Sequence, residues 1–116
     1  VGSSQQGAPI LMHSFGEELR PLLIFAAIHG DEPNTAGVAK RLIEHLDAHP
    51  EAYSGRSVVV IPVANPDGLS RKSRGNIRGV DVNRNFPARN WQPSKPGRYH
   101  GGAAASSEPE TLALIK

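Results

Sequence analysis

A histidine and a glutamate stand three positions apart directly after an apolar run. The run is Leu22–Ile28, seven apolar residues that end at His29, with Glu32 soon after. Such a run predicts a buried strand and is too short to indicate a helix. An imidazole and a carboxylate are ligands that suit zinc, and open α/β sheets bind ligands beyond the carboxyl ends of their strands. His29 and Glu32 are therefore a candidate pair of metal ligands.

A second group of polar residues lies further along the chain, after the next apolar segment and a turn. It contains Asp81, Asn83 and Arg84. A structural interpretation exists for every one of these positions. His and Glu occur three apart by chance in many chains, an aspartate can cap a turn, and an asparagine or arginine can serve a loop or the surface. Their common place after two strands favours a functional site.

The elements that would position these residues follow from the apolar pattern. Strands are predicted at 10–15, 19–28 and 57–63, with a turn at Gly16-Glu17-Glu18 between the first two. Apolar residues at helical spacing predict a helix from Pro33 to about Asp47, with Pro33 at a favourable first position. Strand, helix and strand with short joins predict a right-handed crossover and a parallel pair.

The rest of the chain has less regular patterning. Asn65-Pro66-Asp67-Gly68 predicts a turn, and residues 69–105 show little periodicity, which is uncommon in a compact domain unless the segment is functional. A last helix is predicted from Ser107, with Ser107 and Glu110 as a capping box and Leu112 and Ile115 on its apolar face.

Charge is distributed unevenly. Residues 1–68 carry four Lys or Arg against eight Asp or Glu, a net of −4, whereas residues 69–100 carry eight against Asp81 alone, a net of +7. A basic segment attracts anionic partners, but its few aromatic residues and the lack of a known motif argue against nucleic acid. A small substrate rich in carboxylates fits better, and a solvated basic loop is the alternative.

Composition limits the class of protein. The chain has 116 residues, no cysteine and 38% apolar residues, which is enough for one domain with a real core. No apolar run approaches the roughly 20 residues that span a bilayer, and the first residues lack the pattern of a signal peptide. The expected location is the cytoplasm, with no membrane partner.

Several segments together resemble the zinc carboxypeptidase family, and most closely its bacterial branch of murein peptide amidases. They occur in the family's order: His29-Gly30-Asp31-Glu32, Asn65-Pro66-Asp67-Gly68, the segment from Arg74 through Gly79-Val80-Asp81-Val82-Asn83-Arg84-Asn85-Phe86, and Ser107-Glu108-Pro109-Glu110-Thr111. The opening residues and Tyr99-His100-Gly101-Gly102 are also similar to that branch. The resemblance implies an α/β fold with a mixed, mainly parallel sheet flanked by helices.

The resemblance also implies roles for individual residues. His29 and Glu32 match two ligands of a single zinc ion, and Asp81 matches the carboxylate that orients the histidine. Asn83 and Arg84 match the pair that grips the substrate's terminal carboxylate. Arg74 matches the arginine that stabilises the oxyanion, with Arg71 as its rival. Among the other histidines, His13 is expected to be structural, and His45 and His49, near the end of the predicted helix, are not expected to be catalytic. His100 could be a third ligand by residue type, but the family segment that resembles Tyr99-His100-Gly101-Gly102 supplies none.

Two catalytic groups of the family have no counterpart here. The third zinc ligand, a histidine, and the general-base glutamate follow the Ser-Glu-Pro-Glu-Thr segment in the family, beyond Lys116. The expectation is that residues 1–116 form the N-terminal part of one catalytic domain, with the remainder of that domain as a partner and no activity for this chain alone.

The implied reaction is zinc-dependent hydrolysis of an amide bond next to a residue with a free carboxylate. In the amidase branch this is the γ-D-glutamyl–diaminopimelate bond of murein peptides. Three alternatives remain: an ordinary metallocarboxypeptidase, a deacylase of the aspartoacylase and succinylglutamate desuccinylase kind, and a non-catalytic module that binds an acidic partner through its basic segment.

Overall fold

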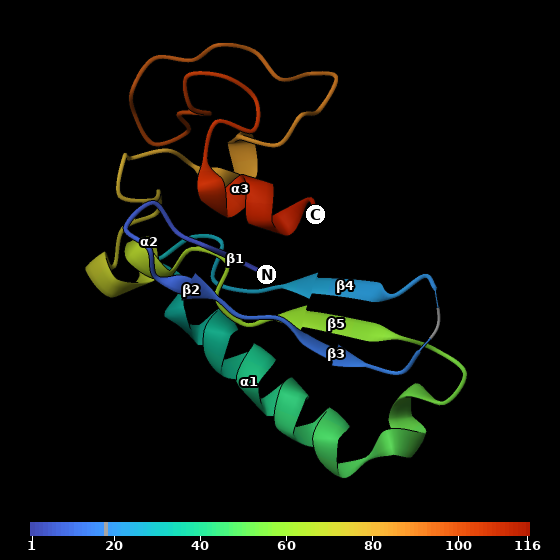
Figure 1. Cartoon of the computed structure of the whole chain (residues 1–116). Coiled ribbons are helices and arrows are strands. Elements are labelled where there is room, and N and C mark those ends of the chain that lie inside the picture. Colours follow the sequence, from blue (N-terminus) through green and yellow to red (C-terminus); the bar gives the residue numbers. More distant parts are fainter. Residues whose placement is uncertain (18) are drawn as a thin grey trace.

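A three-stranded sheet forms the centre of the fold (Figure 1). The computed structural model describes residues 1–17 and 19–116. Strand β5 (Val58–Ile61) lies in the middle, parallel to β4 (Leu22–Phe25) and antiparallel to β3 (His13–Phe15). Helix α1 (Pro33–Ala48) connects β4 to β5. The predicted parallel pair and the mixed character of the sheet are confirmed.

The single strand predicted over residues 10–15 is wrong. The structure has two short strands there: β2 (Pro9–Ile10) pairs with β1 (Gly2–Ser3), and β3 pairs with β5. Leu11 and Met12, between β2 and β3, are exposed. An apolar run indicates extended backbone but does not specify a partner strand, so the change of sheet was not visible in the sequence. The predicted turn at 16–18 includes Glu18, which lies outside the described residues.

Strand β4 is shorter than predicted, and the way in which it ends matters for the site. Leu19 is almost fully exposed, and the strand stops at Phe25. Ala27 adopts a left-handed conformation with a φ of 46°, which is strained for a residue with a side chain. Its N–H donates to Thr35 Oγ1 and its carbonyl accepts from the Asn65 N–H. These bonds hold the turn that carries His29 away from the sheet.

Helix α1 covers one face of the sheet (Figure 1). The helical spacing predicts an apolar face of Ala36, Ala39, Leu42, Ile43 and Leu46. All of these are buried except Leu42, which is partly buried and packs against the same cluster. A 3₁₀ turn, η1 (Pro50–Tyr53), then leads back to β5. Because side chains alternate along a strand, Val60 packs on the α1 side and Ile61 on the other. Each belongs to its own hydrophobic cluster, the second of which is Ile10, Ile61, Ala64, Val82, Ala113 and Leu114.

Short helices follow the sheet. The predicted turn at Asn65 begins helix α2 (Pro66–Arg71), in which the Asn65 side chain accepts a hydrogen bond from the Gly68 N–H. The 3₁₀ turn η2 (Val82–Arg84) lies in the functional region. Helix α3 (Pro109–Leu114) lies beside β1. Among the described residues, no helix is long and apolar enough to cross a membrane.

The predicted start and face of the last helix are wrong. Glu108, not Ser107, is the N-cap residue of α3, and it makes no side-chain cap bond. Glu110 is fully buried and accepts hydrogen bonds from the Gln5 N–H and Asn76 Nδ2, so it does not complete a capping box. Leu112 and Ile115 are exposed. The polar network around Glu110 orients this short helix and turns those two side chains outward.

The aperiodic range 69–105 contains the end of α2 and the 3₁₀ turn η2, but between η2 and α3 the described residues form no helix or strand. Asn85 holds both ends of this last segment. The buried Asn85 side chain donates to the carbonyls of Gly101 and Ala104 and accepts from the Glu108 N–H. This one side chain therefore fixes both ends of a long irregular loop.

Candidate active site

His29 lies in the tight turn between β4 and α1, against the first turn of α2. The Gly30 N–H donates to the Arg74 carbonyl, and the Glu32 N–H donates to the His29 carbonyl. A side chain at Gly30 would overlap the backbone of Gly68. The glycine therefore permits the close approach of the two segments, and His29 is buried with 7% of its surface exposed.

Asp81 joins the two polar groups that the sequence singled out. It is fully buried at the start of η2. Its Oδ1 lies 3.0 Å from His29 Nε2 and accepts the Asn83 N–H, and its Oδ2 accepts Arg74 Nε at 2.9 Å and lies 2.9 Å from Arg74 Nη2. A buried carboxylate must be paired to offset its desolvation, and here a histidine, an arginine and a backbone N–H pair with it.

The bond to Asp81 determines which nitrogen of His29 can act as a ligand. A carboxylate only accepts hydrogen bonds, so in the neutral imidazole Nε2 carries the proton and Nδ1 carries the free lone pair. His29 Nδ1 lies 3.5 Å from Glu32 Oε1, and the Glu32 side chain is about half exposed. A metal-binding histidine commonly donates its other N–H to a carboxylate. This lone pair and the Glu32 carboxylate are a donor set that fits zinc.

These two donors are all that the described residues bring together. In residues 1–17 and 19–116, no group of three or more His, Cys, Asp or Glu side chains could hold a metal ion. His100, a possible third ligand by residue type alone, lies with its Nδ1 3.2 Å from Ser94 Oγ. The third ligand and the general base stay predictions.

Arg74 and Arg71, the two rivals for the oxyanion role, have different surroundings. Arg74 is largely buried, with 16% of its side chain exposed, and it is held by Asp81. Arg71 is exposed in the last turn of α2. The left-handed cap at Lys72 ends the helix and reverses the chain. Among the described residues, Arg74 is therefore the arginine next to His29.

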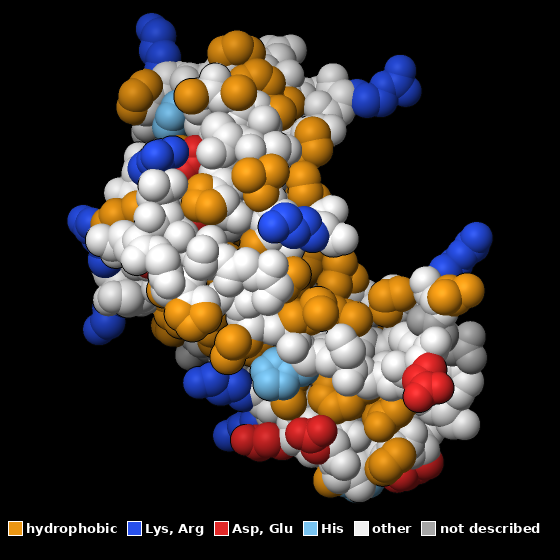
Figure 2. All heavy atoms as spheres, viewed as in Figure 1, with side chains coloured by type: hydrophobic (Ala, Val, Ile, Leu, Met, Phe, Trp, Pro, Cys, Tyr) orange, Lys and Arg blue, Asp and Glu red, His pale blue; other side chains and the backbone are white. Residues whose placement is uncertain are grey.

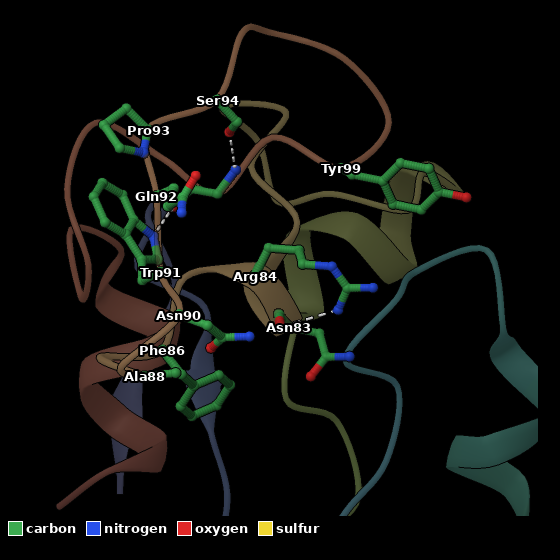
Figure 3. Close-up of a pocket in the computed structure, with 11 residues that line it drawn as sticks. Asn83, Arg84, Phe86, Ala88, Asn90, Trp91, Gln92, Pro93, Ser94 and Tyr99 are labelled. Carbon is green, nitrogen blue, oxygen red and sulfur yellow. Dashed lines mark hydrogen bonds between the residues drawn. The ribbon is translucent and has the colours of Figure 1, made fainter.

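Asn83 and Arg84 line a pocket of about 570 Å³. Figure 3 shows the Arg84 guanidinium between the side chains of Asn83 and Tyr99. Among the described residues, no carboxylate lies within ion-pairing distance of Arg84. The other pocket residues come from the long loop: Phe86, Ala88, Asn90, Trp91, Gln92, Pro93, Ser94, Tyr99 and Gly101. The Arg84 guanidinium donates to the Asn83 carbonyl at 3.4 Å, so the pair stands at the edge of a polar pocket with a guanidinium that no carboxylate of the described residues neutralises.

Tyr99 belongs to a segment that resembles the family branch, but the resemblance implies no role for its side chain. The central carbons of Arg74 and Arg84 lie 5.2 and 5.9 Å from the centre of its ring, within the range of cation–π attraction. The sequence signal that could have identified Tyr99 is an aromatic residue beside arginines in a basic, aperiodic segment.

The surface shows the charge asymmetry that the sequence predicted. In the face drawn in Figure 2, exposed acidic side chains gather on the lower part of the molecule, around α1, and most basic ones lie above and beside them. Arg74, Asp81, Asn83 and Arg84 of the candidate site belong to residues 69–100, which carry the net positive charge. The field near the site therefore favours anions.

Comparison with known proteins identifies the family of this chain. The zinc carboxypeptidase family matches residues 1–116. Murein peptide amidase A of Escherichia coli strain K12 is 34% identical over 99% of this chain and 51% of its own length. Bacteriocin BCN5 of Clostridium perfringens is 33% identical over 97% of this chain and 14% of its own length. The chain thus spans about half of the amidase and less of the bacteriocin.

The fold has close counterparts among solved structures. A murein-tripeptide amidase from Escherichia coli O157 superposes with a TM-score of 0.73 and 30% identity, over 98% of this chain and 52% of that chain. The structural match agrees with the family match over the whole sequence. It also agrees with the α/β architecture that the resemblance implied. The chain belongs to the zinc carboxypeptidase family.

Proposed function

We propose that this chain provides the zinc-binding and carboxylate-binding part of an amidase that cleaves murein peptides. The observation that carries the proposal is the network centred on Asp81, which fixes His29 and Arg74 beside Glu32 and leads through η2 to Asn83 and Arg84. The reaction is hydrolysis of an amide bond next to a residue with a free carboxylate.

Each residue of the site would have its own role in this reaction. His29 Nδ1 and Glu32 would hold one zinc ion, which when bound supplies Lewis-acid polarisation of the scissile carbonyl and lowers the pKa of the attacking water. Arg74, oriented by Asp81, would donate to the carbonyl oxygen as it gains negative charge. Arg84, whose planar guanidinium matches a carboxylate, would anchor the substrate together with Asn83.

The choice of a murein peptide rests on the amidase relatives and on the charge of the site. Murein peptide amidase A shares 34% identity over nearly the whole chain, and the γ-D-glutamyl–diaminopimelate bond lies between residues rich in carboxylates. The family's name favours a second candidate, an ordinary metallocarboxypeptidase. Hydrolysis of murein tripeptide and of a standard C-terminal peptide, by a longer form that spans the whole family domain, distinguishes the two.

Zinc binding tests the metal pair directly. The 116-residue chain should bind zinc weakly and show no turnover, because a catalytic zinc site uses three protein ligands. Glu32→Ala should lower the affinity at least tenfold in zinc titration calorimetry. Asp31→Ala is the matched control: Asp31 is a neighbouring exposed acid and should leave the affinity unchanged. Equal zinc affinity of the Glu32→Ala chain and the unmodified chain would remove Glu32 from the site.

Substrate anchoring gives a second test. In the longer form, Arg84→Ala should lower kcat/KM for a substrate with a free carboxylate by about 10- to 100-fold, since hydrogen bonds to charged groups contribute about 1.5–3 kcal/mol. The same peptide with that carboxylate amidated should lose little. Arg89→Ala, an exposed arginine of the same loop, is the control. If Arg84→Ala reduced the hydrolysis of both peptides equally, the anchoring role would be wrong.

A further inference from the structure

Three guanidinium groups surround the ring of Tyr99. The central carbons of Arg74, Arg84 and Arg98 lie 5.2, 5.9 and 5.9 Å from its centre. Tyr99 is 58% exposed, so the cluster opens to solvent beside the pocket. Three like charges around one exposed ring repel one another, and cation–π attraction offsets only part of that repulsion.

The three arginines differ in what neutralises them. Arg74 is paired with the buried Asp81. Among the described residues, no carboxylate lies within 4.0 Å of Arg84 or Arg98. Two unneutralised guanidiniums thus share the ring of Tyr99. Their central carbons are each 5.9 Å from its centre, so they lie at most twice that distance apart.

We propose that Arg98 and Tyr99 recognise a second carboxylate of the substrate, beyond the one that Asn83 and Arg84 anchor. This inference rests on the proposed function, and it assigns Arg98 and Tyr99 as the residues that select a substrate with two carboxylates over one with a single carboxylate. Arg98 binds the second carboxylate as an ion pair, and the ring of Tyr99 holds the Arg98 guanidinium in place and contacts the aliphatic linker. Guanidinium groups are suited to such pairs.

The position of Tyr99 links the carboxylate anchor at Arg84 to Arg98. Figure 3 shows Tyr99 on the opposite side of the Arg84 guanidinium from Asn83. A carboxylate held by Asn83 and Arg84 therefore lies on the side of the pocket that Tyr99 also lines, and Arg98 lies at the ring of Tyr99. A monocarboxylate substrate would use Arg84 alone and would leave Arg98 without a partner.

The test compares pimelate with its monoamide, two probes of equal length that differ in one carboxylate. Titration of the 116-residue chain at low salt, followed by the NMR signals of the arginine Nε–H groups, gives both dissociation constants. Pimelate should bind about two- to fivefold more tightly, the range expected for one exposed ion pair. The signals of Arg84 should shift with both probes and those of Arg98 only with pimelate.

Variants separate the two carboxylate sites. Arg98→Gln should abolish the preference for pimelate without weakening the monoamide, whereas Arg84→Gln should weaken both probes. Tyr99→Phe should keep the preference, because the ring remains, and Tyr99→Leu should reduce it. Lys95→Gln removes an exposed cation of the same loop and should keep the preference. The same spectra show whether each variant is folded.

The outcomes distinguish this inference from the proposed function. Equal binding of both probes, with loss of both in Arg84→Gln, would overturn the second site and leave the anchor intact. Loss of the preference in Lys95→Gln as well as in Arg98→Gln would also overturn it, since a diffuse positive field would then explain the effect. Binding of neither probe, or binding that Arg84→Gln does not weaken, would overturn the anchor and the second site together.

Discussion

Asp81→Ala should destabilise the chain by about 3–5 kcal/mol, the usual cost of removing one partner of a buried ion pair. The carboxylate is fully buried and carries three partners: His29, Arg74 and the Asn83 N–H. Its loss leaves the largely buried Arg74 guanidinium without a counterion. Urea unfolding measures the effect as a lower midpoint with an unchanged slope.

The same substitution should weaken zinc binding, because Asp81 fixes the His29 ring with Nδ1 facing Glu32. Loss of a carboxylate that supports a ligating histidine typically costs 10- to 100-fold in metal affinity, and about that decrease is expected here. Asp31→Ala serves as the control, since an exposed acid should change neither the stability nor the affinity.

A double substitution tests the physical reason for the loss. If the unpaired Arg74 causes much of the destabilisation, Arg74→Met in the Asp81→Ala background should recover about 0.5–3 kcal/mol relative to additivity. Strictly additive effects would show that Asp81 acts through other contacts, and the interpretation of the pair as one unit would be abandoned.

Gly30→Ala should destabilise the chain by about 1–3 kcal/mol, as expected for an added methyl group without space. The new Cβ would overlap the Gly68 carbonyl and the Leu69 nitrogen, which belong to the backbone of α2. Because backbone atoms cannot rotate away as a side chain can, the His29 turn and α2 must separate. The expected second effect is a shift of the His29 Nε2–H signal in the NMR spectrum, since His29 moves relative to Asp81.

Gly37→Ala is the matched control for this prediction. Gly37 lies within α1, and a Cβ there would meet nothing within 4 Å. Alanine stabilises an exposed helix position by about 0.8–1 kcal/mol relative to glycine, so Gly37→Ala should raise the unfolding midpoint. The same glycine-to-alanine change should thus lower the free energy of unfolding at position 30 and raise it at position 37. A neutral Gly30→Ala would show that the two segments are not packed as closely as the structure indicates.

Much of the fold was accessible from local patterns. The period of Ala36, Ala39, Ile43 and Leu46 predicted α1 and its buried face, and the apolar segments predicted the parallel pair of β4 and β5. Pairing partners were not accessible in the same way. Residues 10–15 form parts of two different pairings, because extended backbone can pair with any free strand edge and only long-range packing selects one.

The last helix shows the same limit. Ser107 and Glu110 have the spacing of a capping box, yet Glu110 is fully buried and bonds Gln5 and Asn76. A carboxylate at that position satisfies either a local cap or a distant donor. Glu110 pairs with the distant donors because it is buried, and an unpaired buried carboxylate costs far more free energy than an uncapped helix end.

The sequence by itself determined the chemistry that this protein has available: an imidazole and a carboxylate after a strand, an aspartate in a second polar group, and arginines in a basic loop. The tertiary structure decided which of these act together. Asp81 reaches His29 across 52 positions of the chain, Arg74 rather than Arg71 pairs with Asp81, and Tyr99 gathers three guanidinium groups. The physical reason is that side-chain identity is local, whereas burial and charge pairing depend on which distant segments pack against one another.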